Sequence, residues 1–337
     1  MTSSSTPPVP PPSDLRAALE ARTRRRRTAL ITGGAIAGAA LLVGGVVGAL
    51  LLTGGDPAGA TGGAGGTTDG AERLSLTIAG SGESELQDAV ALVAAEKGLD
   101  VEWVNFENDW VLPNSSLVAG EVDANAFQHI TFLSAFNTAN DADLTPVFST
   151  TISQWGVFSS SIDDLDGLQT GDRIVIPDDA SNGGRALFLL EDAGLIELAD
   201  DAGSYPTVDD VTANDLALEF VPVQAVTIPQ QLDDPAIAAI VVGTSYFDPS
   251  QGIDSDDALF LDDALAESSL PYVNVIAARA GDVDDPAFGI LQEVYQDERV
   301  AAGLEADSFG TTQLVEVPVD ALRERLAELE QLARGIE

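Results

Sequence analysis

An arginine that follows two glycines is the side chain of this sequence best suited to binding a small anion. Residues 181–194 read SNGGRALFLLEDAG, shortly after an apolar run that ends at Pro177. This order predicts a strand, a polar loop and the start of a helix. Glycines let the backbone approach a ligand, the first amides of a helix attract an anion, and Arg185 adds a planar cation. Two interpretations follow: a site for a small carboxylate or phosphate, or a capped helix in which Arg185 pairs with a nearby acidic side chain.

Two other segments place polar side chains beside aromatic or apolar ones. Residues 123–129 read DANAFQH and bring Phe127 close to His129, the single histidine of the chain. A lone histidine beside aromatic residues is more often packed and hydrogen-bonded than in contact with a ligand. Asn274 lies within the apolar segment 269–279. Because a buried amide must be hydrogen-bonded, Asn274 either bonds to the backbone or faces a cavity.

The composition argues against several kinds of site and partner. The chain of 337 residues is long enough for two domains, and it has no cysteine and one histidine. Disulfides, thiolate or multi-histidine metal sites and a histidine base are therefore not expected. The net charge of -40 argues against nucleic acid and against docking on an anionic membrane surface. We expect no metal, no cofactor and no catalytic residue.

The N-terminal part of the chain combines a basic tail, an apolar run and a linker. Residues 1–27 are rich in Ser, Thr, Pro and Arg and predict a disordered tail. The uncharged residues 28–53 exceed the roughly 20 apolar residues that cross a bilayer, and the arginines before them place the tail in the cytoplasm and the rest outside the cell. A cleaved signal peptide is the alternative, although its apolar core is usually about 7 to 15 residues. Residues 54–71 predict a flexible linker.

From residue 74 onward the pattern is that of an α/β domain. Apolar residues alternate from Leu74 to Ile78 as in a strand, residues 84–87 (SELQ) form a helix capping box, and residues 101–106 predict the next strand. A unit of strand, helix and strand indicates a parallel sheet. Further strands are expected at residues 173–176, 218–223, 237–242 and 272–278.

Two later segments carry expectations of their own. Residues 318–334 begin with proline and place four leucines on one helical face, which predicts a surface helix packed through that face. These leucines are Leu322, Leu326, Leu329 and Leu332. The Asp-rich residues 254–263 predict a solvated loop rather than a calcium site, because they lack the glycine and the terminal glutamate of an EF-hand loop.

The three polar segments, together with residues 109–114 (DWVLPN) and 229–234 (PQQLDD), resemble the NlpA lipoprotein family, the methionine-binding subunits of ABC importers. The resemblance extends from about residue 74 to about residue 301. It implies an α/β, two-lobed periplasmic-binding-protein-like fold with a ligand cleft between the lobes, here preceded by a single N-terminal transmembrane helix. Residues 72–158 and 271–337 would form lobe 1 and residues 159–270 lobe 2, each with a mainly parallel sheet.

The resemblance also implies a role for each residue that matches the family's motifs. Arg185 would hold the carboxylate of a free amino acid, and Asn182 and Asn274 would be polar partners of its amine and carboxylate. An aromatic cage would surround the thioether. Its walls would be Trp110, Phe127, His129 and Tyr272.

The sequence departs from the family at three places. It has no cysteine for a lipid, so residues 28–53 would replace that anchor. Gly243 stands where the family has an asparagine that contacts the ligand. Residues 151–155 lack the aromatic and proline pair expected there, although Trp155 lies close. Methionine is the leading ligand, and another amino acid, or a methionyl dipeptide admitted by the space at Gly243, is the alternative.

The resemblance predicts an extracellular, membrane-tethered substrate-binding protein that captures methionine and delivers it to an ABC permease. The cytoplasmic ATPase would be a partner subunit, because this chain has no GxxxxGK[ST] loop. A sensor that does not transport its ligand is a second possibility. A hydrolase acting in the cleft is a third, but neither a G-x-S-x-G elbow nor an H-E-x-x-H motif supports it.

Overall fold

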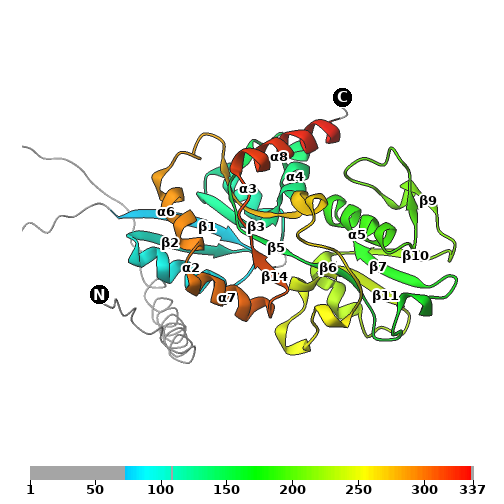
Figure 1. Cartoon of the computed structure of the whole chain (residues 1–337). Coiled ribbons are helices and arrows are strands. Elements are labelled where there is room, and N and C mark those ends of the chain that lie inside the picture. The colour runs from blue at the N-terminus through cyan, green and yellow to red at the C-terminus, as the bar shows by residue number, and fades with distance from the viewer. Residues whose placement is uncertain (1–72, 108, 335–337) are drawn as a thin grey trace, which may run out of the picture. The chain divides into compact units, whose positions relative to one another are not determined.

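A computed structural model describes residues 73–107 and 109–334, which build two five-stranded sheets with helices packed against them (Figure 1). The strands of sheet 1 are, in spatial order, β2 (Leu99–Asn105), β1 (Leu74–Gly80), β3 (Ala124–His129), β13 (Asn274–Arg279) and β4 (Leu144–Ser149). The strands of sheet 2 are β10 (Glu219–Val223), β7 (Arg173–Pro177), β11 (Ala239–Gly243), β6 (Trp155–Phe158) and β12 (Ala258–Leu261).

Each sheet is mainly parallel, as expected, with one strand reversed. In sheet 1, β1 runs parallel to β2 and β3, and β13 lies antiparallel between β3 and β4. In sheet 2, β7 runs parallel to β10 and β11, and β6 lies antiparallel between β11 and β12. Two short ladders complete the pairing. They join β5 (Thr151–Ser153) to β14 (Thr312–Leu314), and β8 (Glu197–Leu198) to β9 (Val211–Ala213).

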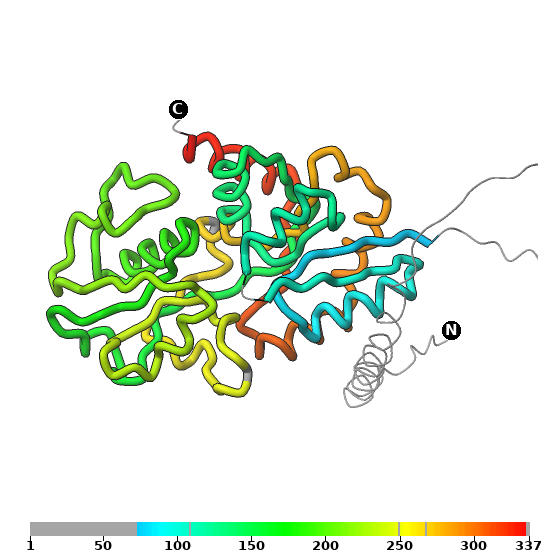
Figure 2. The backbone as a smooth tube through the Cα atoms, turned by 180° about the vertical axis from the view of Figure 1, so that it is seen from behind, coloured from blue at the N-terminus to red at the C-terminus, as the bar shows by residue number. Residues whose placement is uncertain are grey.

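Helices cover both faces of sheet 1, which explains why its strands are apolar on both sides. Leu76 and Ile78 of β1 pack with α2, α6 and α7, whereas Ala79 packs with α3, α4 and α8 on the opposite face. Figures 1 and 2 both show α8 lying beside α4. The helices of this half are α2 (Glu85–Glu96), α3 (Leu112–Ala119), α4 (Ile130–Asn140), α6 (Pro286–Tyr295), α7 (Glu298–Ser308) and α8 (Val319–Ala333).

Sheet 2 is covered by α5 (Ala180–Asp192) on one face and by the 3₁₀ segment Ala225–Gln231 on the other. Leu187 and Leu190 of α5 pack with Ile174 in one core cluster, and Ile228 packs with Val175 in the other. The alternation along β7 therefore divides its side chains between two cores.

The chain passes between the sheets twice, and both crossings lie close together. It leaves sheet 1 through β5 and enters sheet 2 at Trp155, and it returns to sheet 1 at Asn274. Because β6 pairs with β11 and β12, sheet 2 already begins before the lobe boundary expected at residue 158. Gln154, between β5 and β6, accepts a hydrogen bond from the Thr244 amide at 2.9 Å and donates one to the Thr311 carbonyl at 3.3 Å.

The expected N-terminal segments, residues 1–27, 28–53 and 54–71, lie outside the described residues. Among the described helices, none has the length and apolar character that a bilayer crossing demands.

The leucine face of α8 is packed over most of its length, but not at its end. Leu322, Leu326 and Leu329 are buried against the core of sheet 1, whereas Leu332 is 54% exposed. The expectation for Leu332 was wrong because α8 ends one residue later, at Ala333, so its last turn has no packing partner to cover it.

This difference can be measured by denaturant unfolding. Leu322→Ala should lower the free energy of unfolding by about 2 to 5 kcal/mol, because it leaves a cavity in a packed core. Leu332→Ala, the matched control on the same helix, should change it by no more than about 0.5 kcal/mol. Equal losses from the two substitutions would contradict the packing described here.

Candidate functional site

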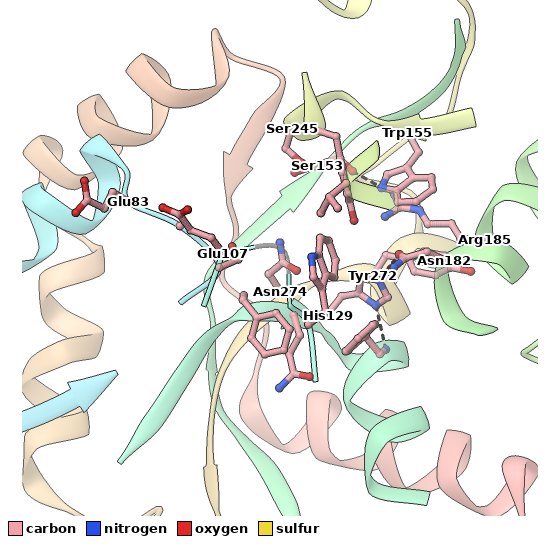
Figure 3. Close-up of a pocket in the computed structure, with 18 residues that line it drawn as sticks. Glu83, Glu107, His129, Ser153, Trp155, Asn182, Arg185, Ser245, Tyr272 and Asn274 are labelled. Carbon is pink, nitrogen blue, oxygen red and sulfur yellow. Dashed lines mark hydrogen bonds between the residues drawn. The ribbon is translucent and has the colours of Figure 1, made fainter. Parts of the chain in front are cut away.

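A cavity of about 620 Å³ lies where elements of the two sheets meet, and all seven residues expected at a ligand site line it (Figure 3). Its volume is within the range of about 300 to 1,000 Å³ that is typical of small-molecule sites. Strands β3 and β13 of sheet 1 supply Phe127, His129 and Asn274, and Trp110 lies just before α3. Helix α5 supplies Asn182 and Arg185, and Tyr272 lies on the crossing back to sheet 1.

The segment around Arg185 is helical from its start, so the expected polar loop is absent. Asp179 is the N-cap of α5, and its Oδ1 accepts a hydrogen bond from the Asn182 amide at 2.9 Å. This cap lets the helix begin at Ala180, ahead of both glycines. The prediction of a glycine loop was wrong because the sequence signal of an aspartate cap was not weighed against that of the glycines.

The two glycines of α5 serve close packing. A Cβ atom at Gly183 would lie 2.8 Å from the carbonyl oxygen of Pro177, at the end of β7. A Cβ atom at Gly184 would lie 3.0 Å from Cδ of Pro206. The glycines therefore let α5 approach its neighbours closely, and they do not open a path to a ligand.

Arg185 is buried and held on several sides. Its Nη2 donates to Oδ2 of Asp262 at 2.8 Å and to the carbonyl oxygen of Ser153 at 3.1 Å. Its guanidinium carbon lies 4.8 Å from the ring centre of Trp155 and 4.3 Å from that of Tyr272. Both sequence interpretations are therefore present together: Arg185 pairs with an acidic side chain and also lines the cavity.

Both hydrogen bonds of Arg185 start from Nη2, so among the described residues neither Nη1 nor Nε has an acceptor. Its Nε is buried and has no hydrogen-bond partner within the described part of the chain. Burial lowers the pKa of Arg185, and the Asp262 carboxylate opposes that effect; a guanidinium nevertheless stays protonated in proteins. A buried N–H without an acceptor is unfavourable, so this end of the site is suited to an anion.

His129 connects sheet 1 to α5 through a chain of hydrogen bonds (Figure 3). Its Nδ1 caps α4 by accepting from the Phe132 amide at 3.2 Å, which assigns the ring proton to Nε2. Nε2 then donates to Oδ1 of Asn182 at 3.0 Å, and Nδ2 of Asn182 donates to Oδ2 of Asp179 at 3.0 Å. Burial lowers the pKa of His129 to about 4, so the ring is neutral near pH 7.

Aromatic rings form the wall beside these polar groups. Trp110 stacks on Tyr246 with ring centres 5.4 Å apart, and it meets Phe127 edge to face at 6.5 Å. Phe132 contacts both Trp110 and Phe127. Tyr246 and Phe132 were not expected at the site. The available signal was their position in the sequence: Phe132 lies shortly after residues 123–129, and Tyr246 lies shortly after the strand expected at residues 237–242.

A buried network of amides supports this wall. Asn114 and Gln128 exchange two hydrogen bonds at 2.6 and 2.7 Å, and Asn125 bonds to both. The network ties α3 to β3 and so fixes the strand that carries Phe127. Asn125 itself is fully buried and does not line the cavity.

Asn274 faces the cavity, which settles the two possibilities raised by its sequence context. Its Nδ2 donates to Oγ1 of Thr151 at 3.0 Å. This bond assigns the amide orientation and leaves Oδ1 without a hydrogen-bond partner among the described residues.

Asp262 is the main residue that the sequence did not reveal. It belongs to the Asp-rich segment expected to be a solvated loop, yet it forms an ion pair with Arg185 and its side chain is only 16% exposed. Its Oδ1 also accepts from the Trp155 amide at 2.8 Å. Nothing distinguishes Asp262 in sequence from the acidic residues around it. The expectation of a solvated loop was wrong for Asp262 and for Ala258–Leu261, which form β12 and pair with β6.

The space expected at Gly243 is occupied. A Cβ atom at Gly243 would lie 2.7 Å from Nε1 of Trp155, and the two residues are paired across β11 and β6. The indole therefore fills the volume that a side chain at position 243 would need. The reason given for admitting a dipeptide, free space at Gly243, does not hold.

A family model described as NlpA lipoprotein matches residues 74–316. The D-methionine-binding lipoprotein MetQ of Yersinia pestis is 36% identical over 239 residues, which are 71% of this chain and 86% of that protein. The protein of the same description from Escherichia coli K12 is 37% identical over 219 residues, 65% of this chain and 79% of that protein.

Solved structures agree with these relatives. A crystal structure of the methionine binding protein MetQ is 34% identical, with a TM-score of 0.66, and the match covers 72% of this chain and 99% of that one. A nutrient binding protein from Burkholderia cenocepacia, solved bound to methionine, is 31% identical, with a TM-score of 0.65 over 72% of this chain and 99% of that one.

The buried, neutral His129 predicts a pH dependence of stability. The unfolded chain binds a proton near pH 6.5, whereas the folded site does so only near pH 4, so the free energy of unfolding should fall as the pH is lowered through this range. The stabilisation is on the order of 3 kcal/mol above pH 6.5, and it is lost as the pH falls to about 4. The measurement is the pH profile of unfolding for the native chain and for His129→Asn, which keeps a capping side chain but does not titrate. Parallel profiles between pH 4 and 6.5 would contradict the assignment.

Proposed function

The chain belongs to the NlpA lipoprotein family, and on that premise we propose that it is the substrate-binding protein of an ABC importer, which captures methionine and delivers it to the permease. The relatives named as methionine-binding proteins and the methionine-bound structure support this ligand. Binding, not catalysis, is the proposed activity.

The observation that carries the proposal is a buried cation at one end of a cavity walled by aromatic rings. Arg185 offers an unpaired Nε to a carboxylate, and a desolvated pair of guanidinium and carboxylate is strong and directional. Trp110, Phe127 and Tyr272 line the same cavity. A thioether gains roughly 0.3 to 1.5 kcal/mol from each contact with such a ring. A free amino acid with a sulfur-containing side chain satisfies both ends.

The polar residues divide into two roles. Asn274 keeps Oδ1 available, because its Nδ2 is bonded to Thr151, and we assign this oxygen to the ammonium of the ligand. Asn182 is already bonded to His129 and Asp179. Its second Nδ2 hydrogen can reach the ligand, but its main role in the proposal is to hold α5 against β3 when the site is closed.

We propose that sheets 1 and 2 belong to two lobes that close on the ligand. The hinge would consist of the two crossings, near residues 151–155 and 272–274. Three contacts would join the lobes in the closed state: His129 with Asn182, Trp110 with Tyr246, and the hydroxyls of Ser134 and Tyr205.

We further propose that residues 28–53 anchor the protein in the membrane, with residues 1–27 in the cytoplasm and residues 54–71 as a tether. The support is the uncharged run flanked by arginines, and the lack of any cysteine that could carry a lipid. The permease, and the ATPase that drives it, would be the partner subunits. The tether would keep the binding domain close to them outside the cell.

Calorimetric titration tests the ligand directly. L-Methionine should bind at micromolar concentration or tighter, and D-methionine, glutamine and a methionyl dipeptide should be compared in the same buffer. Binding of another amino acid without methionine would reassign the ligand. Binding of none of these would count against the proposed function.

Arg185→Ala should weaken methionine binding by roughly 30-fold or more, because a buried carboxylate would lose its charged partner. Arg334→Ala is the matched control, since Arg334 lies at the end of α8 with its side chain 40% exposed. Circular dichroism and thermal unfolding would establish that both variants are folded. Unchanged affinity in a folded Arg185→Ala variant would remove Arg185 from the site.

A further inference from the structure

Trp155 and Gly243 form one structural unit at the inner end of the cavity. They are cross-strand partners, Trp155 at the first position of β6 and Gly243 at the last position of β11. The pyrrole edge of the indole lies over the glycine, since a Cβ atom at position 243 would be 2.7 Å from Nε1, 3.1 Å from Cε2 and 3.2 Å from Cδ1. Only a residue without a side chain allows the indole to take this position.

The indole is fixed in place by its neighbours. The Trp155 amide donates to Oδ1 of Asp262, and the Asp262 amide donates back to the Trp155 carbonyl at 2.9 Å. Oδ2 of the same aspartate holds Arg185. A single carboxylate thus sets the position of the tryptophan backbone and of the guanidinium, and the guanidinium in turn packs on the indole ring.

The indole N–H of Trp155, like Nε of Arg185, is a donor that makes no hydrogen bond. Trp155 is 3% exposed and lines the cavity, and among the described residues no group accepts a hydrogen bond from its Nε1. Arg185 is 4% exposed, and its Nε is also unpaired. Two donors without an acceptor, the indole Nε1 and the buried Nε of Arg185, therefore belong to residues that pack on each other and line the same cavity.

We propose that Trp155 is a specificity-determining residue, whose indole N–H, seated over Gly243, joins Arg185 in binding the carboxylate of the ligand. The inference rests on the proposed function and assigns a new contact within that site.

The chemistry of the two donors determines what they select. An indole N–H and a guanidinium can only donate, whereas an asparagine side chain at position 243 would both donate and accept. The inner end therefore admits a group that only accepts, and favours one with negative charge. An ammonium or a carboxamide NH₂ placed there would face the donors with its own hydrogens, so this end rejects ligands whose carboxyl group is blocked as an amide.

The binding test compares L-methionine with L-methioninamide on the full chain in detergent. Trp155→Phe keeps an aromatic ring near Arg185 but removes the N–H, and it should weaken methionine binding roughly tenfold or more. Methioninamide should bind weakly to the native chain and change little in the variant, so the preference for methionine should fall. Trp103→Phe is the matched control, because it removes an indole N–H that bonds to the Gln87 carbonyl and does not line the cavity.

Two results would overturn the inference. One is native affinity and preference in Trp155→Phe. The other is an equal loss for methionine and for methioninamide, which would show that the ring only packs. Failure of the proposed function is a separate result and is seen in the native chain, which would then bind another free amino acid but not methionine. In that case the same comparison is made with that amino acid and its amide.

The packing of the pair can be tested without any ligand. Gly243→Ala should lower the melting temperature in the native background, because the new Cβ atom displaces the indole. The same substitution should have little effect in a Trp155→Ala background, where no ring occupies the space. Equal shifts in the two backgrounds would contradict the seating of Trp155 over Gly243, and with it the proposed position of the N–H.

Discussion

The burial of a permanent positive charge is the constraint on which the rest of the site depends. A guanidinium removed from water is unfavourable unless other groups replace the lost solvation. Here one carboxylate, one backbone carbonyl and two aromatic faces surround Arg185. Ser153 and Trp155 belong to one crossing between the sheets, and Tyr272 belongs to the other. The groups that stabilise the cation are therefore also those that determine how the two halves meet.

A second constraint is that the contacts joining the two halves beside the cation are uncharged. His129 donates to Asn182 from Nε2 while Nδ1 accepts from the Phe132 amide; the second bond needs a neutral imidazole, and burial keeps the ring neutral. Trp110 and Tyr246 meet through ring faces. In a chain with a net charge of -40, neutral contacts avoid both repulsion and the cost of burying further ions. The positive charge at the inner end is thus left to interact with the ligand.

Sequence predicted the α/β class, the mainly parallel sheets and seven of the residues that line the cavity. The strands were predictable because their alternation is local, whereas the seven residues came from the resemblance to a family. Prediction failed where the outcome depends on distant packing. Gly183 and Gly184 are helical because Asp179 caps α5 and Pro177 and Pro206 press against it. Asp262 could not be separated from its acidic neighbours, because its importance comes from a partner 77 positions away in sequence. Motifs indicate which residues take part, but they do not indicate which ones pair.

The contact between Gly243 and the indole also limits the order in which this site can change. An asparagine introduced at position 243 beside Trp155 would have its Cβ atom 2.7 Å from the ring nitrogen, and the backbone of two paired strands cannot move aside easily. A smaller residue at position 155 beside Gly243 would leave only a cavity, which costs stability but not the fold. To replace the pair Trp155 and Gly243 by a smaller residue at position 155 and an asparagine at position 243, the side chain at position 155 must become smaller first. Only then is there room for a side chain at position 243. The two positions are mutationally coupled, and substitutions tested one at a time will underestimate what the pair can accommodate.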